Sequence, residues 1–188
     1  MSQLDVSGAA VEPGQSKPER GAGLVEVFAN EVRSLDKRER RGDLSDLRRL
    51  DVDAPASAAF FRMVAKVAPE TGPDALKRYA RLLQILSLKP DAMAPINLGQ
   101  AMVHAKISEN RVQKLLSARG SGLAEQLRLV ARRLASAGAL SYRQIGELLL
   151  APDDSERAER LRLTIARDYW VALDLALPPE SETLLETP

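Results

Sequence analysis

Apolar residues recur every three or four positions through most of this chain, in segments that end at proline or glycine. In the clearest segment, Leu123, Leu127, Val130 and Leu134 are followed by Gly138. This spacing places the apolar side chains along one face of an α-helix, and glycine often ends a helix. No segment alternates apolar and polar residues for long enough to predict a strand. The sequence therefore predicts an all-α fold of about eight or nine helices, with no sheet.

Prolines and shifts in composition divide the chain into parts. Pro90 and Pro95 fall between helical segments near the middle of the sequence. The first residues are rich in Gly, Ser, Pro and Glu and lack periodicity, whereas the last residues carry glutamate and no basic side chain. We therefore expect a disordered leader over residues 1–22, an N-terminal helical lobe over 23–95, a C-terminal helical lobe over 96–177 and an acidic tail over 178–188.

The side chains that most catalytic and metal sites require are scarce. The chain has no cysteine and His104 is its only histidine, so thiol catalysis and a zinc site built from Cys and His are excluded. Asp153 and Asp154 are adjacent acids, but acids at a helix start are typical of capping, and Asp153 with Glu156 fits the spacing of a capping box. We therefore predict no enzymatic activity, no cofactor and no metal.

No stretch approaches the roughly 20 apolar residues that a membrane span requires. The N-terminal segment also lacks the basic and then apolar order of a secretory signal. Together with the absence of cysteine, these features predict a cytoplasmic protein that does not enter the membrane.

Basic residues are concentrated in the middle of the chain, although the whole chain has a net charge of only +1. Between residues 77 and 133 there are eleven Lys or Arg residues and three acids, whereas the chain after Arg167 has acids only. Solvated surfaces normally mix both signs of charge. A surface of one sign repels itself, and a phosphate backbone would relieve that repulsion, so the pattern indicates nucleic acid as the partner.

Two pairs of basic residues lie one helical turn apart and opposite the apolar face of their helix. Lys77 and Arg81 form one pair, and Arg128 and Arg132 form the other, with no acid four residues from either pair. Basic residues spread over several helices would position a backbone without reading bases. Because we identify no helix-turn-helix, zinc finger or aromatic sheet platform, we predict binding without sequence specificity.

Two further features have alternative interpretations. Residues 120–122, Gly-Ser-Gly, open a predicted helix, and we interpret them as a simple turn between helices; a phosphate bound to the free amides is the alternative. They lack the lysine and the spacing of a nucleotide-binding loop. Tyr169 and Trp170 lie in the last predicted helix, and we interpret both as core residues rather than as platforms for stacked bases.

Several short motifs occur in an order that resembles the CasB family, the small helical subunit of the type I-E Cascade complex of CRISPR immunity. The resemblance covers about residues 24 to 175. One departure is Tyr142, where the family pattern implies tryptophan; a tyrosine fills much of the same core site. The matching motifs are RRGDLSDLRR at 40–49, NLG at 97–99, SENR at 108–111, LLSAR at 115–119, EQLR at 125–128 and ARDYW at 166–170.

The resemblance implies a non-catalytic subunit of two helical lobes that is present in two copies in Cascade. It implies contacts with the guide RNA, the target and displaced DNA strands and the backbone and large subunits, and stabilisation of the R-loop. Two alternatives stay open: a helical adaptor whose basic face binds an acidic protein, and a sequence-specific regulator. The residues predicted to hold nucleic-acid backbone are Arg48, Arg49, Lys77, Arg81, Arg111, Arg128 and Arg132.

Overall fold

The computed structural model describes residues 20–176, so the predicted acidic tail and almost all of the predicted leader lie outside the described residues. Within this range the chain forms nine α-helices, one 3-10 helix and two very short strands, which confirms the predicted all-α fold. The elements are α1 (Arg20–Lys37), α2 (Arg41–Arg48), α3 (Ala58–Val67), α4 (Pro73–Leu86), η1 (Pro90–Ala92), β1 (Met93–Ala94), α5 (Leu98–His104), α6 (Glu109–Ser117), α7 (Gly120–Ser136), β2 (Leu140–Ser141), α8 (Tyr142–Leu150) and α9 (Glu156–Ala176).

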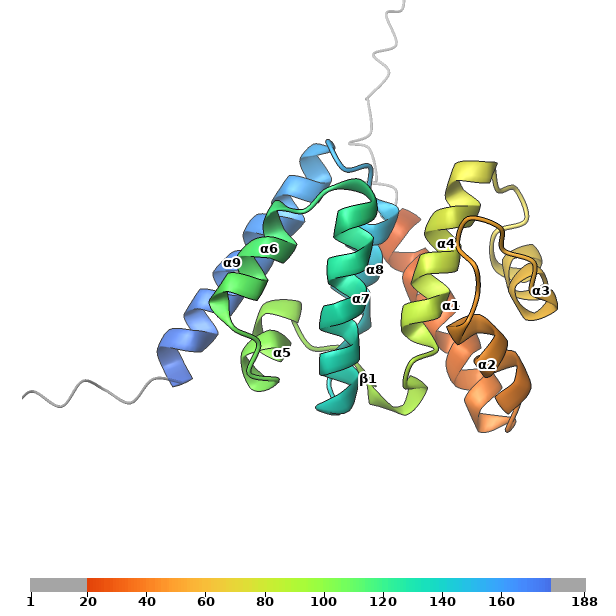
Figure 1. Cartoon of the computed structure of the whole chain (residues 1–188), viewed down its shortest axis with the longest axis horizontal. Coiled ribbons are helices and arrows are strands. Elements are labelled where there is room, and N and C mark those ends of the chain that lie inside the picture. The colour runs from red at the N-terminus through yellow and green to blue at the C-terminus, as the bar shows by residue number, and fades with distance from the viewer. Residues whose placement is uncertain (1–19, 177–188) are drawn as a thin grey trace, which may run out of the picture.

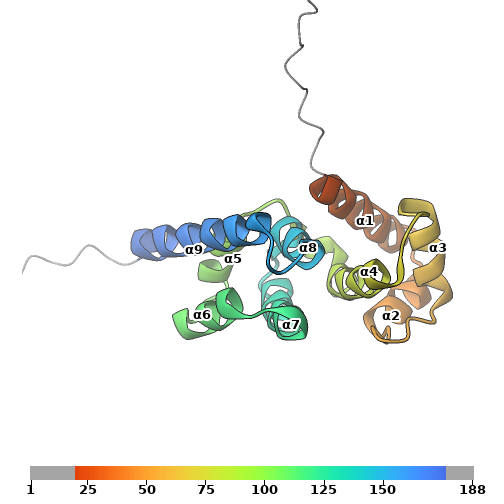
Figure 2. The same ribbon diagram turned by 90° about the horizontal axis from the view of Figure 1, so that it is seen from above.

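The helices form two groups that meet at α8. Figure 1 shows α1 to α4 on one side and α5, α6, α7 and α9 on the other, with α8 behind α7 and beside α1. Seen from above, α2, α4, α7 and α6 lie along one side of the molecule, and α1, α8 and α9 lie along the opposite side (Figure 2). We call α2, α4, α6 and α7 the front layer.

The core is one continuous cluster of buried side chains that reaches from α1 to α9. In α8, Ile145 and Leu148 are buried, and Gly146 lies against Val25 of α1 and Leu82 of α4. A Cβ at Gly146 would lie 2.5 Å from Cγ1 of Val25, so the absence of a side chain lets α8 approach α1 closely. The two predicted lobes therefore share a core, and their boundary at residue 95 stays a prediction.

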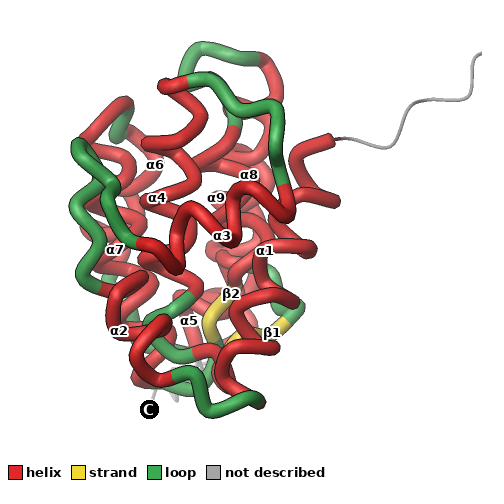
Figure 3. Tube along the Cα trace, turned by 90° about the vertical axis from the view of Figure 1, so that its right-hand side faces the viewer, coloured by secondary structure: helices red, strands yellow, loops and turns green. Residues whose placement is uncertain are grey.

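The only strands in the described range are β1 and β2, which pair in parallel over two residues each. Met93 pairs with Leu140 and Ala94 with Ser141, as Figure 3 shows where the two yellow segments meet. The Ser141 hydroxyl donates to the carbonyl of Ile96 at 2.7 Å. This short pairing fastens the segment between the two groups of helices to the start of α8, and it was not predicted because two residues carry no alternation.

α5 packs closely against α9 at Gly99. A Cβ at Gly99 would lie 2.4 Å from the backbone nitrogen of Tyr169 and 2.6 Å from the carbonyl oxygen of Ile165. Tyr169 is buried, and its hydroxyl donates to the carbonyl of Ile107 at 2.8 Å. Burial raises the pKa of the Tyr169 phenol, and the Glu109 carboxylate raises it further, so the phenol remains a donor at neutral pH. The prediction that Tyr169 is a core residue is confirmed.

Tyr142 is also buried, and it connects α8 to α1. Its hydroxyl donates to Oε2 of Glu26 at 2.7 Å, and the guanidinium of Arg33 lies 4.8 Å from the centre of its ring. Burial raises the pKa of the Tyr142 phenol, and the bond to Glu26 raises it further, while Arg33 lowers it. Tyrosine therefore fills this core site, as expected, and its hydroxyl adds a contact with a charged partner.

We expect Tyr142→Phe to lower the free energy of unfolding by about 1–2 kcal/mol, because a hydrogen bond to a carboxylate is lost while the ring stays. Urea denaturation measures this change. Tyr79→Phe is the matched control, since the Tyr79 ring packs on Phe28 and its hydroxyl makes no hydrogen bond within residues 20–176. Equal effects of the two substitutions would contradict a stabilising role for the Tyr142 hydroxyl.

Candidate nucleic-acid interface

All seven predicted binding residues lie on the front layer or directly after one of its helices. α7 shows why their side chains face outward: Leu127 and Leu134 are buried against the core, while Arg128 and Arg132 lie on the opposite face and are exposed. The helix is amphipathic, so burial of the apolar stripe forces the basic stripe into solvent. Figures 1 and 2 show that α4 and α7 are neighbours in this layer.

Two hollows lie between the α4 segment and α7, and together we call them the groove. The two helices lie side by side and run in the same direction (Figure 1). One hollow at the N-terminal end of α7 has a volume of about 180 Å³ and is lined by Arg81 and Ser121 among others. A second hollow of about 370 Å³ lies at the C-terminal end and is lined by Lys89 and Arg132. Basic side chains therefore line both ends of the groove, and Asp153 also lines the first of them.

Most of the predicted residues are available to bind a ligand. Arg49, Arg111, Arg128 and Arg132 are exposed, and Arg81 is half-buried in the groove. None of these five side chains makes an ion pair or a hydrogen bond with another described residue. Cations without a paired carboxylate are typical of a surface that meets a polyanion, although the hollow that Arg81 lines also contains Asp153.

Two of the predicted residues have partners within the fold. Nε of Arg48 donates to the carbonyl of Ser87, so this side chain fastens the end of α2 to the end of α4. Lys77 forms an ion pair of 3.2 Å with Asp53, a residue far from it in sequence. The expectation that no acid neutralises Lys77 is therefore wrong, because folding brings in an acid that the helical spacing does not reveal. This pair is exposed, so it is weak and screened by salt.

The N-terminal end of α7 is already occupied by a carboxylate. Oδ2 of Asp153 accepts a hydrogen bond of 2.7 Å from the backbone N–H of Gly120. The interpretation of residues 120–122 as a phosphate seat therefore requires an anion to displace Asp153, and the simple turn between helices is the better description. Asp153 does not cap its own helix: the Ser155 hydroxyl accepts the N–H of Ala158 at 3.2 Å instead.

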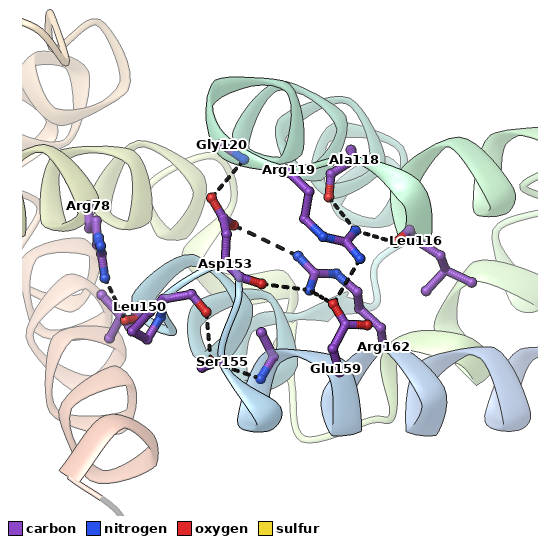
Figure 4. Close-up of polar contacts among 12 residues, drawn as sticks. Arg78, Leu116, Ala118, Arg119, Gly120, Leu150, Asp153, Ser155, Glu159 and Arg162 are labelled. Carbon is purple, nitrogen blue, oxygen red and sulfur yellow. Dashed lines mark hydrogen bonds and ion pairs between the residues drawn. The ribbon is translucent and has the colours of Figure 1, made fainter.

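A buried arginine holds the same loop in place (Figure 4). Nη1 of Arg162 donates to the Asp153 carbonyl at 3.1 Å and to Oε1 of Glu159 at 2.8 Å, and Nη2 lies 3.8 Å from Oδ1 of Asp153. Arg119 shares the same Glu159 oxygen at 2.8 Å. These cations are engaged in structural contacts, so we exclude Arg119 and Arg162 from the candidate interface.

Three basic residues outside the predicted binding set also line hollows, and of these the sequence pattern had placed only Lys106 in a basic cluster, with Arg111, Lys114 and Arg119. Lys89 lines the groove, and Lys106 and Arg133 line a separate hollow of about 260 Å³ together with His104. Their charges belong to the basic region between residues 77 and 133. Only folding brings Lys106 beside Arg133, so spacing along one helix gave no indication of this hollow.

The described residues offer no arrangement for metal or acid–base chemistry. No group of three or more His, Asp or Glu side chains among them is placed to hold a metal ion. His104 is exposed and shares its hollow with cations rather than with a carboxylate that would orient it. No helix between residues 20 and 176 is both long enough and apolar enough to cross a membrane.

Trp170 differs from the prediction. Its side chain is 39 % exposed, whereas its neighbour Tyr169 is buried. Leu163, seven residues earlier on the same face of α9, is also exposed. The interpretation of Trp170 as a core residue is therefore wrong, because the two aromatic residues lie about 100° apart around the helix.

The fold and this surface define a small helical protein with a basic front layer and a hydrophobic core. A protein-family model described as CRISPR-associated protein Cse2 matches residues 43–170, and the chain belongs to this family, which is also known as CasB. The family resemblance noted in the sequence is confirmed: Cse2 is the non-catalytic small subunit of the type I-E Cascade complex. The comparisons found no match among curated proteins and none among solved structures.

Proposed function

We propose that this Cascade subunit holds nucleic-acid backbone along its front layer without sequence specificity and thereby stabilises the R-loop. The observation that supports the proposal is the set of cations without an ion pair on neighbouring helices: Arg81 and Arg132 line the groove between α4 and α7, and Arg128 is exposed on α7. Arginines of this kind bind phosphate oxygens and carry no base readout. Strand exchange in an R-loop is nearly balanced energetically, so backbone contacts of modest strength tip it.

The proposed ligands are the guide RNA and the target and displaced DNA strands. The proposed protein partners are the backbone and large subunits of Cascade and a second copy of this chain. These partners follow from the family, and a cytoplasmic location follows with them. Arg49 and Arg111 lie on the same front layer as the groove, at α2 and α6, so a strand longer than the groove would meet them too.

The double substitution Arg128→Ala with Arg132→Ala should weaken binding to single-stranded DNA on the order of tenfold at low salt. Each lost phosphate contact removes about 0.7 from the slope of log affinity against log salt, so the slope should fall by about 1.4. The loss should be equal for unrelated sequences, because no base is read. Fluorescence anisotropy with labelled oligonucleotides, titrated with salt, measures both quantities.

Arg160→Ala with Arg167→Ala is the matched control. It removes the same charge from exposed positions on α9, which lies on the opposite side of the molecule, and should leave binding and salt slope unchanged. R-loop stability in the assembled complex provides a second readout for both variants. If the Arg128/Arg132 variant matches wild type in both assays, the proposal is wrong. Tight binding to an acidic protein without nucleic acid would favour the adaptor, and preference for one duplex site would favour a regulator.

A further inference from the structure

Two hollows meet at the C-terminal end of α7, and both are lined by basic side chains. His104, Lys106 and Arg133 line one, Lys89 and Arg132 line the other, and Ser136 belongs to both. No carboxylate lines either hollow among the described residues. In Figure 1 this end of α7 lies between the end of α5 and the segment that follows α4. The cations therefore come from three separate parts of the chain and converge on one residue.

Lys106 adopts a backbone conformation that normally favours glycine. Its φ is 54°, in the left-handed region where a Cβ crowds the backbone. It ends α5 in a Schellman motif: Ile107 N–H donates to the Met102 carbonyl and Lys106 N–H to the Val103 carbonyl, both at 2.9 Å. A residue held in strained backbone geometry points to a function for its side chain.

The end of α7 provides an internal comparison. There the same motif is closed by Gly138, with φ of 77°, and its N–H donates to the carbonyl of Ala135 at 3.1 Å. The chain thus uses glycine at one of these two neighbouring helix ends and lysine at the other. Local stability favours glycine at both positions, but Glu39 after α1 has a similar φ of 56°, so the conformation alone does not assign a ligand. What points to a ligand is that the Lys106 charge shares a hollow with Arg133 and no carboxylate.

A purely structural explanation of these cations is the alternative to ligand binding. Cations near a helix C-terminus interact favourably with the helix dipole. Arg133 fits it in part, because its Nε donates to the Ala105 carbonyl at 3.3 Å. The explanation does not account for Lys106, which is exposed and makes no hydrogen bond through its side chain with a described residue. It also does not account for the position of the cations in two hollows that share Ser136.

We propose that these hollows form a binding site for consecutive phosphates of one nucleic-acid strand, which crosses the end of α7 at Ser136. Lys106 and Arg133 hold one phosphate, and Lys89 and Arg132 hold the next. The inference rests on the proposed function and extends it, because Lys89, Lys106 and Arg133 lie outside the set that helical spacing predicts. The ligand is the phosphodiester backbone, of DNA or of RNA.

The sharpest test is Lys106→Gly, because binding and folding should change in opposite directions. Removal of the Cβ relieves the strained φ, so the Tm should stay equal or rise. Removal of the charge should lower affinity for oligo-dT about fivefold at about 0.1 M salt and reduce the salt slope by about 0.7. Lys89→Gln should give a similar loss, and oligo-U of equal length should lose as much as oligo-dT if only phosphate is contacted. A loss confined to oligo-U would assign the site to RNA through its 2′-hydroxyls.

Crosslinking tests the location of the strand directly. The chain has no cysteine, so Ser136→Cys introduces a single attachment point for a photo-crosslinker, and Leu163→Cys on α9 is the control. We expect Ser136 to crosslink to the oligonucleotide, in the free subunit and in assembled Cascade, and Leu163 not to. Lys106→Gly in the Ser136→Cys background should reduce the yield.

These measurements separate failure of this site from failure of the proposed function. If Arg128→Ala with Arg132→Ala weakens binding but Lys106→Gly and Lys89→Gln do not, the strand does not cross the end of α7 and only this inference is overturned. If wild type binds neither oligonucleotide and Ser136 never crosslinks in the complex, both fail. Lys106→Gln replaces Lys106→Gly should the glycine variant not fold, since it removes the charge and keeps the side chain's length.

Discussion

Replacement of Gly99 by alanine should lower the free energy of unfolding by about 3 kcal/mol, at the upper end of the usual cost of overpacking. The new Cβ would lie 2.4 Å from the Tyr169 nitrogen and 2.6 Å from the Ile165 carbonyl oxygen, and both are backbone atoms that cannot rotate away. α5 and α9 would have to move apart along their whole contact. The hydrogen bond from Tyr169 to the Ile107 carbonyl, which depends on this spacing, would lengthen or break.

Thermal denaturation measures this effect directly. For a chain of this size each 1 kcal/mol shifts the Tm by about 2–4 °C, so a fall of about 6–12 °C is expected. Gly122→Ala is the matched control, because Gly122 is also helical and nothing lies within 4 Å of a Cβ built there. Alanine should stabilise α7 at that position by up to about 1 kcal/mol. A Gly99→Ala protein as stable as the Gly122→Ala protein would contradict the described packing of α5 on α9.

Helices were predictable from the sequence because their signals are local. The segment from Leu123 to Leu134 became part of α7 as expected, since its apolar spacing matches one helical face. Contacts between distant residues were not predictable in this way. The requirement for glycine at position 99 arises from α9, more than sixty residues later in the chain, and a single sequence gives no measure of that distance. The parallel pairing of β1 with β2 was missed for the same reason.

The same distinction between local signals and tertiary contacts applies to the candidate interface. Exposure of Arg128 and Arg132 follows from amphipathicity, so helical spacing found them. The ion pair of Lys77 with Asp53 and the bond from Arg48 to Ser87 depend on tertiary contacts, and spacing did not reveal them. The hollow at the end of α7 was missed because its cations come from separate segments. Charge density along the sequence indicated a basic region but did not indicate which of its cations make contacts within the fold.

Asp153 illustrates how a local sequence pattern can assign a capping residue to the wrong helix. Its spacing from Glu156 predicts a cap for α9, yet its carboxylate caps α7 and Ser155 caps α9. A carboxylate at either helix start is favourable for the same electrostatic reason. The tertiary arrangement decides which helix receives it, because Arg162 fixes the loop that carries Asp153. The residue type therefore indicated a helix cap, but the sequence did not reveal which helix the Asp153 carboxylate caps.

Arg162→Ala should lower the free energy of unfolding by about 3 kcal/mol, because the substitution removes a cation with only 4 % of its side chain exposed. The Asp153 carbonyl and the Glu159 carboxylate would each lose a donor, and a cavity would replace the side chain. Nε and Nη2 of Arg162 have no hydrogen-bond partner within the described chain. The stabilisation therefore comes from Nη1, from the charge and from packing, and Arg162→Met should cost less than Arg162→Ala because it restores volume.

Asp153→Ala should cost about 2 kcal/mol, because it removes the N-terminal cap of α7 together with a carboxylate beside Arg162. In the double variant the two losses should not add, with a coupling free energy between about 0.5 and 3 kcal/mol, since the residues interact directly. Arg160→Ala is the control on the same helix: its ion pair with Glu156 is exposed, so its loss should cost less than about 0.5 kcal/mol. Urea denaturation of the two single variants, the double variant, Arg160→Ala and the wild-type protein measures these free energies of unfolding. If Arg162→Ala proves no more costly than Arg160→Ala, the buried arginine does not hold the loop between α8 and α9 against the start of α7.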